Sequence, residues 1–142
     1  MREILFRGRD HAGKWHKGSA TSRIEEDPAT TMLYVAYYIQ DYGLSGEEHE
    51  VDPETVVPLV FEATEHHPEI WEGDIIEDED GCRMVVAFTY YNQTRYVITH
   101  SKTRVGYVSL DENYLRFKFK YRKAKVVGNI HDNPELITEP FS

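Results

Sequence analysis

The chain has 142 residues, 40% of them apolar, and its 16 Lys and Arg against 25 Asp and Glu give a formal charge of −9 at pH 7. We expect a single domain over residues 1–142, because a chain of this length buries enough surface to form a core without disulfides or metals. A lone Cys82 excludes an internal disulfide and favours a cytoplasmic location, although a secreted protein with few cysteines has the same composition. No apolar run reaches about 18 residues, and no apolar segment follows the basic start. The sequence therefore predicts neither a transmembrane helix nor a signal peptide.

Charge is distributed unevenly along the chain. Residues 1–24 carry six basic and two acidic side chains, residues 25–80 carry eighteen acidic and no basic ones, and residues 81–142 carry ten basic and five acidic ones. Blocks of like charge are typical of a solvated surface, and basic residues elsewhere in the fold are expected to face them. The alternative is functional: the acidic surface binds a basic partner or imitates the charge of nucleic acid.

Strand patterns dominate the first part of the chain. Residues 4–8 and 14–18 flank the polar segment 10–13, which ends in a glycine, and this arrangement predicts a β-hairpin. Residues 32–39 are rich in Tyr and Val, and the turn residues Gly43, Ser45 and Gly46 follow them. This composition favours a strand over a helix.

The middle of the chain contains a second hairpin signal. Asp52 followed by a proline predicts the start of a helix, which Pro58 would interrupt within two turns. We therefore predict either a short helix or the edge of a strand here. Residues 74–76 lead into the acidic segment 77–81, and β-branched and aromatic residues resume over residues 82–91. We therefore predict a hairpin with an acidic tip.

Short extended segments follow in the last third, at residues 96–98, 106–110 and 126–130. The most regular pattern lies at residues 115–121, where apolar side chains alternate with cations. A period of two predicts a strand with one apolar and one basic face. Short strands at this spacing predict a mainly β fold, β-rich α+β at most, of short antiparallel strands arranged as a small barrel or sandwich.

No motif in the sequence predicts a catalytic, metal or cofactor site. The seven histidines show no metal-ligand spacing: His11 and His16 lie five residues apart, His66 and His67 are adjacent, and His49, His100 and His131 are isolated. The serines lie in no nucleophile elbow, and no glycine-rich phosphate loop is present. The acidic residues around Cys82 are expected to raise its pKa and suppress its reactivity.

A basic segment near the end of the chain is the candidate binding site for nucleic acid. Its proposed contacts are Arg116, Lys118, Lys120 and Arg122. A basic strand face can follow a phosphate backbone, but the aromatic residues of a strand would lie on the opposite face, in the core. The structural alternative is that these cations protect an exposed strand from edge pairing and balance the acidic middle of the chain.

Three segments together resemble the YopX family of phage and prophage proteins. They are residues 1–8 with Trp15 and Gly18, residues 71–76 (Trp-Glu-Gly-Asp-Ile-Ile), and residues 126–136, which include Gly-Asn-Ile and Asn-Pro-Glu-Leu. Residues 57–68 depart from the family pattern. The motif positions that we interpret as structural are Trp71, Glu72, Gly73, Asp74, Gly128, Asn129, Asn133 and Pro134. Among them, Gly73 suits a tight turn before a strand, and Gly128 suits a close approach of two backbones.

The resemblance implies a mainly β protein with a small SH3-like barrel portion, encoded by a phage or prophage and acting in the bacterial cytoplasm. It implies no activity. Our first hypothesis is therefore a non-enzymatic module that binds a host or phage protein, with no cofactor and no membrane association. The ten tyrosines and two tryptophans suit an interface between copies as well as a core, so homo-oligomerisation is a further prediction. The alternative hypothesis is a nucleic-acid-binding protein that uses the basic strand face.

Overall fold

The computed structural model describes residues 5–41, 46–89, 94–100 and 105–138. The chain divides into two compact units, Met1–Leu59 and Val60–Ser142. Antiparallel strands dominate the described residues, so the predicted mainly β class is confirmed. Their two sheets have the strand orders β4-β3-β2-β1-β5-β6 and β10-β9-β8-β7-β11, and neither closes into a barrel. The predicted turn residues Gly43 and Ser45, and residues 1–4 of the first motif, lie outside the described residues.

Unit 1 begins with the predicted hairpin. Strands β1 (Phe6–Arg9) and β2 (Trp15–Glu26) pair antiparallel, and at the turn the N–H of Asp10 donates to the carbonyl of Lys14 at 2.9 Å. Gly13 has a φ of 88°, a conformation that favours glycine. The remaining elements of this unit are β3 (Leu33–Asp41), β4 (Glu48–Val51), the 3₁₀ helix η1 (Pro53–Thr55) and β5 (Val57–Phe61), which continues into unit 2.

The predicted short helix is η1. The Asp52 side chain accepts a hydrogen bond from the N–H of Glu54 at 3.1 Å, so Asp52 is the N-cap and Pro53 is the first helical residue. The N–H of Arg9 donates to the buried Thr55 Oγ1 at 2.8 Å, which ties the helix to β1.

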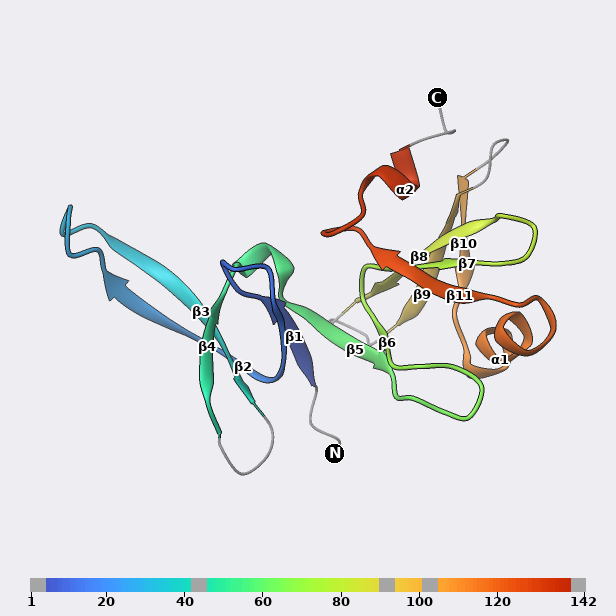
Figure 1. The fold of residues 1–142 in the computed structure, drawn as a ribbon, viewed down its shortest axis with the longest axis horizontal. Helices are drawn as coiled ribbons and strands as arrows, with labels where there is room; N and C mark the ends of the chain where they lie inside the picture. The colour runs from blue at the N-terminus through green and yellow to red at the C-terminus, as the bar shows by residue number, and fades with distance from the viewer. Residues whose placement is uncertain (1–4, 42–45, 90–93, 101–104, 139–142) are drawn as a thin grey trace. The chain divides into compact units, whose positions relative to one another are not determined.

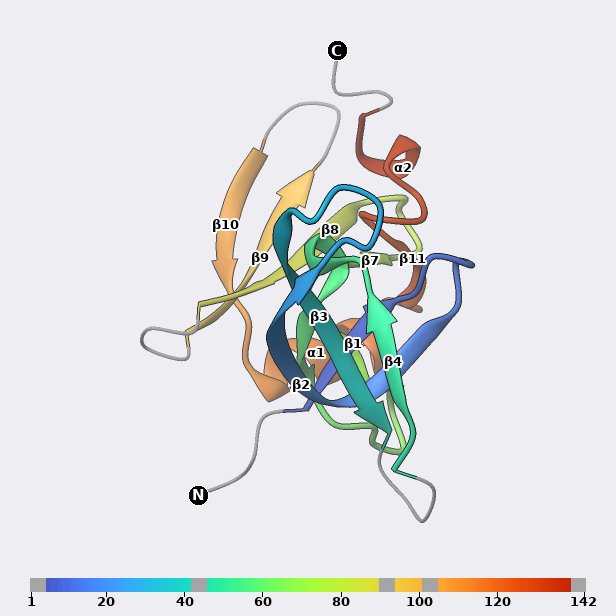
Figure 2. The same cartoon turned by 90° about the vertical axis from the view of Figure 1, so that its left-hand side faces the viewer.

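Strands β2 and β3 form the longest pairing in unit 1, from Gly18 opposite Asp41 to Glu26 opposite Leu33. Strand β1 pairs with β2 only over residues 15–18, and β4 pairs with β3 only over residues 37–40. Residues 19–26 and 33–37 therefore run beyond most of the sheet as a two-stranded extension, visible in Figures 1 and 2. We refer to this extension as the β2–β3 ribbon.

Unit 2 contains the second predicted hairpin. Strands β7 (Asp74–Glu77) and β8 (Arg83–Phe88) pair antiparallel, and Gly81 in the acidic tip between them has a φ of 79°. The other elements of the unit are β6 (Ile70–Trp71), β9 (Arg95–His100), β10 (Val105–Ser109), α1 (Glu112–Tyr121), β11 (Lys125–Asn129) and α2 (Glu135–Thr138). Strand β11 pairs with β7 and completes one side of the second sheet.

The hydrophobic core of unit 2 lies between this sheet and α1. Its buried members are Val60, Phe61, Ile70, Ile76, Met84, Val86, Leu110, Leu115 and Ala124. Leu115 is only 1% exposed, and burying a leucine stabilises the folded state by about 1.5–3 kcal/mol. In the part of the chain that the structure covers, no helix has the length and apolarity needed to cross a bilayer.

The prediction of a strand at residues 115–121 is wrong, because this segment lies in α1. The helix begins at Asp111, whose side chain accepts a hydrogen bond from the N–H of Tyr114 at 2.7 Å. Leu115 and Phe119, four residues apart, share the side that packs on the core. Phe117 and Tyr121 are 49% and 62% exposed, so two of the four apolar side chains in the alternating pattern do not pack in the core.

Candidate functional site

The helical conformation of α1 separates the four predicted nucleic-acid contacts into two pairs. Residues four positions apart share one side of a helix, so Arg116 lies with Lys120, and Lys118 lies with Arg122. Arg116 and Lys120 are exposed, whereas Lys118 and Arg122 are partly buried. The single basic face that a strand would have presented is therefore absent from this helix.

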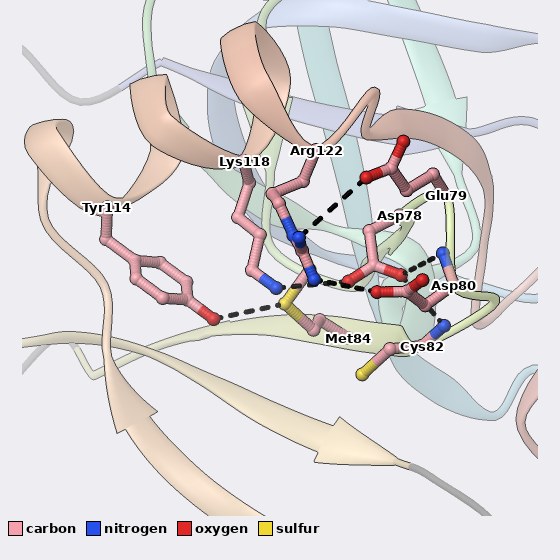
Figure 3. Close-up of polar contacts among 8 residues, drawn as sticks. All are labelled: Asp78, Glu79, Asp80, Cys82, Met84, Tyr114, Lys118 and Arg122. Carbon is pink, nitrogen blue, oxygen red and sulfur yellow. Dashed lines mark hydrogen bonds and ion pairs between the residues drawn. The ribbon is translucent and has the colours of Figure 1, made fainter.

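Lys118 and Arg122 bind the acidic tip between β7 and β8 (Figure 3). Lys118 Nζ lies 3.1 Å from Asp78 Oδ2, and Arg122 Nη2 lies 2.7 Å from Asp80 Oδ2. Arg122 Nη1 also lies 3.8 Å from Glu79 Oε1. These contacts match the structural alternative considered for the basic segment, in which its cations balance the acidic middle of the chain.

Asp78 is the buried centre of this cluster. Burial raises the pKa of its carboxyl, but the hydrogen bonds from Lys118 and from the N–H groups of Cys82 and Asp80 outweigh burial, so the pKa lies below its usual value. Burial lowers the pKa of Lys118, but the hydrogen bond and the charge of Asp78 raise it, so the pKa lies above its usual value. Burial and then the charge of Asp78 raise the pKa of the Cys82 thiol, which disfavours the reactive thiolate.

The outer side of α1 combines cations with aromatic rings. Phe117 and Tyr121 are exposed, and their ring centroids lie 5.9 Å apart. Lys120 Nζ lies 5.3 Å from the centroid of the Tyr121 ring, and Arg116 is exposed on the same helix. Strand geometry would have placed these aromatics in the core, away from the cations. In the helix, both kinds of side chain are available at the surface, a combination that binds single-stranded nucleic acid in other proteins.

The first group of family-motif residues forms the tight turn from β6 to β7. Gly73 has a φ of 88°, and its N–H donates to the carbonyl of Val86 at 2.8 Å. The N–H of Trp71 donates to the buried Asp74 Oδ2 at 2.8 Å. Glu72 lies at the same turn, where burial raises its pKa while a hydrogen bond from the N–H of Phe88 lowers it, with burial the larger effect. These contacts give the motif a structural role in the sheet.

The second group fixes the turn that follows β11. The buried Asn129 side chain accepts hydrogen bonds from the N–H groups of His131 and Asp132, both at 2.9 Å. The N–H of Asn133 donates to the carbonyl of Asn129 at 2.8 Å. A Cβ at Gly128 would lie 2.2 Å from Asn133 Oδ1, so only glycine fits there. The exposed Pro134 precedes α2.

The β2–β3 ribbon has two different faces. Residues that pair directly across antiparallel strands share a face, which places Arg23, Glu25 and Tyr38 together. The guanidinium carbon of Arg23 lies 3.9 Å from the centroid of the Tyr38 ring, and Glu25 accepts hydrogen bonds from Tyr34 and Tyr38. Arg23 Nη2 also lies 2.8 Å from Glu48 Oε1. The polar side chains of this first face therefore bind one another.

The opposite face of the ribbon is apolar and exposed. Ile24 pairs with Val35, and the two side chains are 73% and 52% exposed. Leu33 and Tyr37 lie on the same face and are 70% and 36% exposed. Adjacent exposed apolar side chains of this kind mark interaction surfaces in monomeric proteins. We refer to Ile24, Leu33, Val35 and Tyr37 as the apolar ribbon face.

A cluster of histidine and carboxylate groups lies at the other end of the sheet in unit 1. His16, Asp41 and His49 each offer one ligand atom, and these atoms all lie within 4.8 Å of one another. His16 begins β2, Asp41 ends β3 and His49 lies in β4, so antiparallel pairing brings residues distant in sequence to one end of the sheet. Their sequence separations match no metal motif, which is why sequence reasoning missed the cluster. Two imidazoles and one carboxylate are a ligand set that binds transition metals.

Comparison with known families supports part of this description. The family model described as YopX protein matches residues 63–138, which is more than half of the chain. The chain therefore belongs to the YopX family, and the predicted resemblance is confirmed. The matched range lies within unit 2 and contains both groups of motif residues described above. No curated protein matches the chain.

Proposed function

We propose that this YopX-family protein is a non-enzymatic interaction module of a phage or prophage, and that it binds a host or phage protein in the bacterial cytoplasm. The apolar ribbon face is the observation that carries the proposal. Four large apolar side chains on one face of a two-stranded ribbon are exposed in the described chain. Covering them with a partner removes apolar surface from water, which is the main driving force of protein association.

Charge near the apolar ribbon face defines the chemistry of the partner. Glu26 pairs with Leu33 and so lies on this face, at its outer end, whereas Glu48 and Glu50 pair with Gln40 and Tyr38 and lie on the opposite face. Arg23, the cation of the ribbon, is already paired with Glu48. We therefore expect a partner whose apolar surface has a basic residue opposite Glu26, because complementary charge increases the association rate and excludes acidic competitors.

Site-specific photo-crosslinking tests the proposal directly. A photoreactive amino acid at Ile24 places the probe on the apolar ribbon face, and the same amino acid at exposed Thr21, which pairs with Tyr38, places it on the opposite face as a matched control. In host cells, we expect the Ile24 probe to give one covalent product with another protein. Unlabelled wild-type protein competes for that partner in extracts, whereas a Val35→Asp variant does not.

Two results would contradict a host or phage partner. Equal crosslinking from the two faces would remove the role of the apolar ribbon face. A covalent dimer of the chain would identify a second copy as the occupant, in agreement with the prediction of homo-oligomerisation instead.

A second candidate function, binding of single-stranded nucleic acid, is favoured by the outer side of α1. There Arg116 and Lys120 lie beside exposed Phe117 and Tyr121. This set differs from the predicted one, because Lys118 and Arg122 are engaged with Asp78 and Asp80. Phosphate contacts by cations and stacking on aromatic rings are the two components of such binding.

Salt-dependent binding of a labelled oligonucleotide tests this candidate. We expect Arg116→Glu to weaken the affinity and to lower the slope of log K against log salt by about one. Lys14→Glu, at an exposed cation of unit 1, makes the same charge change and is the control. Equal effects of the two variants, or no binding at low salt, would leave the outer side of α1 without this function.

A further inference from the structure

We propose that His16, Asp41 and His49 bind one divalent transition-metal ion of the Zn²⁺ class. The three residues come from three neighbouring strands of one sheet, and their ligand atoms lie within 4.8 Å of one another. Bonds of about 2.0–2.2 Å from zinc to nitrogen and oxygen place the ligands of one ion roughly 3–4 Å apart. Because an imidazole binds a metal in the plane of its ring, the partly exposed His49 ring must turn out of its stack on the His16 ring for all three atoms to reach one ion.

His49 and Asp41 already have the spacing of two ligands of one ion. His49 Nε2 lies 2.8 Å from Asp41 Oδ2, and a shared proton joins them in the absence of metal. Binding the ion replaces this proton, because a ligating imidazole nitrogen must present its lone pair. The exposed fractions of the two side chains are 21% and 31%, so an ion can reach them from solvent.

His16 supplies the third, more rigid ligand. Its side chain is 7% exposed, and its ring stacks on the His49 ring with centroids 3.7 Å apart and planes 13° apart. His16 Nε2 lies 2.7 Å from Asp10 Oδ2, while Asp10 Oδ1 accepts hydrogen bonds from the N–H groups of Ala12 and Lys14. This carboxylate fixes the orientation of the imidazole, and Nδ1 is the ring nitrogen that Asp10 does not contact. In known metal sites, carboxylates hold ligating histidines in the same manner.

The donor set determines the class of metal. Imidazole nitrogen suits Zn²⁺, Co²⁺, Ni²⁺ and Cu²⁺, whereas Mg²⁺ and Ca²⁺ prefer oxygen ligands alone. An ion at this position links the beginning of β2, the end of β3 and strand β4. It therefore stabilises the sheet from which the β2–β3 ribbon extends, and we assign it a structural role.

Titration of the untagged, metal-free full chain with Zn²⁺ and Co²⁺ tests the site. We use a Cys82→Ser background, so that thiolate binding does not contribute to the signal. We expect one saturable equivalent, an increase of the thermal midpoint with Zn²⁺, and a visible Co²⁺ spectrum typical of nitrogen and oxygen ligands. His49→Gln and Asp41→Asn should each weaken the affinity by more than tenfold, and Asp10→Asn by about 10–100-fold.

The control is His11→Gln, which removes an exposed histidine outside the cluster and should leave the affinity unchanged. Far-ultraviolet circular dichroism of each metal-free variant shows whether it is folded, and the partly exposed His49 provides a variant that should retain the fold if His16→Gln does not. The proposal is overturned if no saturable binding occurs, or if a folded His49→Gln protein binds Zn²⁺ as tightly as the parent. Binding of Mg²⁺ or Ca²⁺ in preference to Zn²⁺ would overturn the assigned class.

Discussion

The β7–β8 hairpin and the β2–β3 ribbon are both two-stranded antiparallel pairs rich in aliphatic residues, but they differ in what covers them. Helix α1 packs on Ile76, Met84 and Val86 of the hairpin, all of which are buried. The apolar ribbon face has no such layer among the described residues, and Ile24 and Leu33 are 73% and 70% exposed. Similar strand composition thus contributes a core in one region and an exposed surface in the other. The difference arises from a covering element and not from the strands themselves.

The largest expected effect comes from removing the contact between α1 and the hairpin. Leu115→Ala should lower the free energy of unfolding by about 2–5 kcal/mol, because it deletes a buried side chain and leaves a cavity. Leu33→Ala on the ribbon should change it by less than about 0.5 kcal/mol. Urea denaturation of both variants measures the contrast. Similar losses in the two variants would show that the apolar ribbon face is covered after all.

The ion pair at the tip of the hairpin should have the next largest effect. Lys118→Met keeps most of the side-chain volume but leaves the buried Asp78 carboxylate without its cation, at a cost of about 1–3 kcal/mol. Lys120→Met, two residues away on the exposed side of α1, is the control and should cost less than about 0.5 kcal/mol. The same urea experiment distinguishes them, and equal effects would remove the ion pair as the cause.

Acid should weaken the same ion pair. The pKa of Asp78 is lower in the folded chain than its unfolded value of about 3.9. Its stabilising contribution is therefore complete above that value and is lost as the pH falls through the folded pKa. Between about pH 6 and about pH 3, Asp78→Asn should lose less stability than the wild type. Urea midpoints at the two pH values measure this difference, and parallel losses would contradict the assignment to Asp78.

The smallest expected change in stability is at the ribbon. Ile24→Lys adds a charge where the side chain already faces solvent, so the free energy of unfolding should stay within about 0.5 kcal/mol of the wild-type value. Fluorescence of a dye that binds apolar surfaces should nevertheless decrease. A marked loss of stability would indicate that the isoleucine is buried in solution.

Local chemistry in the sequence predicts most of the turns and strands. The Asp10 and Gly13 turn, the Asp52 N-cap and the acidic tip ending in Gly81 each depend on residues adjacent in the chain, and all three are present in the structure. Residues 115–121 were misassigned because alternating apolar side chains also fit a helix when some of them are exposed. The helix signal is Asp111 followed by Glu112, an N-cap and an acidic first turn, ahead of the helix-favouring residues Leu115, Arg116, Lys118 and Lys120.

The candidate sites depend on contacts that local chemistry does not contain. His16 and His49 stack because two strand ends meet, and nothing in their sequence separation indicates this. Ile24 and Val35 are exposed because no other element of the described chain packs on their face of the ribbon, whereas an apolar residue in a strand is normally expected to be buried. The pairing of Lys118 with Asp78 was anticipated only as a general balance of charge. These features follow from tertiary arrangement.

The position of β11 beside β7 has a consequence for synthesis on the ribosome. Lys125 of β11 pairs with Glu77 of β7, so the two strands of this pair are made far apart in time. Until β11 is translated, the hydrogen-bonding groups along one edge of β7 are open to other nascent chains. Strand β1 of unit 1 is in the same position, because Phe6 pairs with Pro58 of β5, whereas the β1–β2 and β2–β3 hairpins can close earlier. Each unit thus contains a strand with an edge that stays open until a distant partner strand has been made.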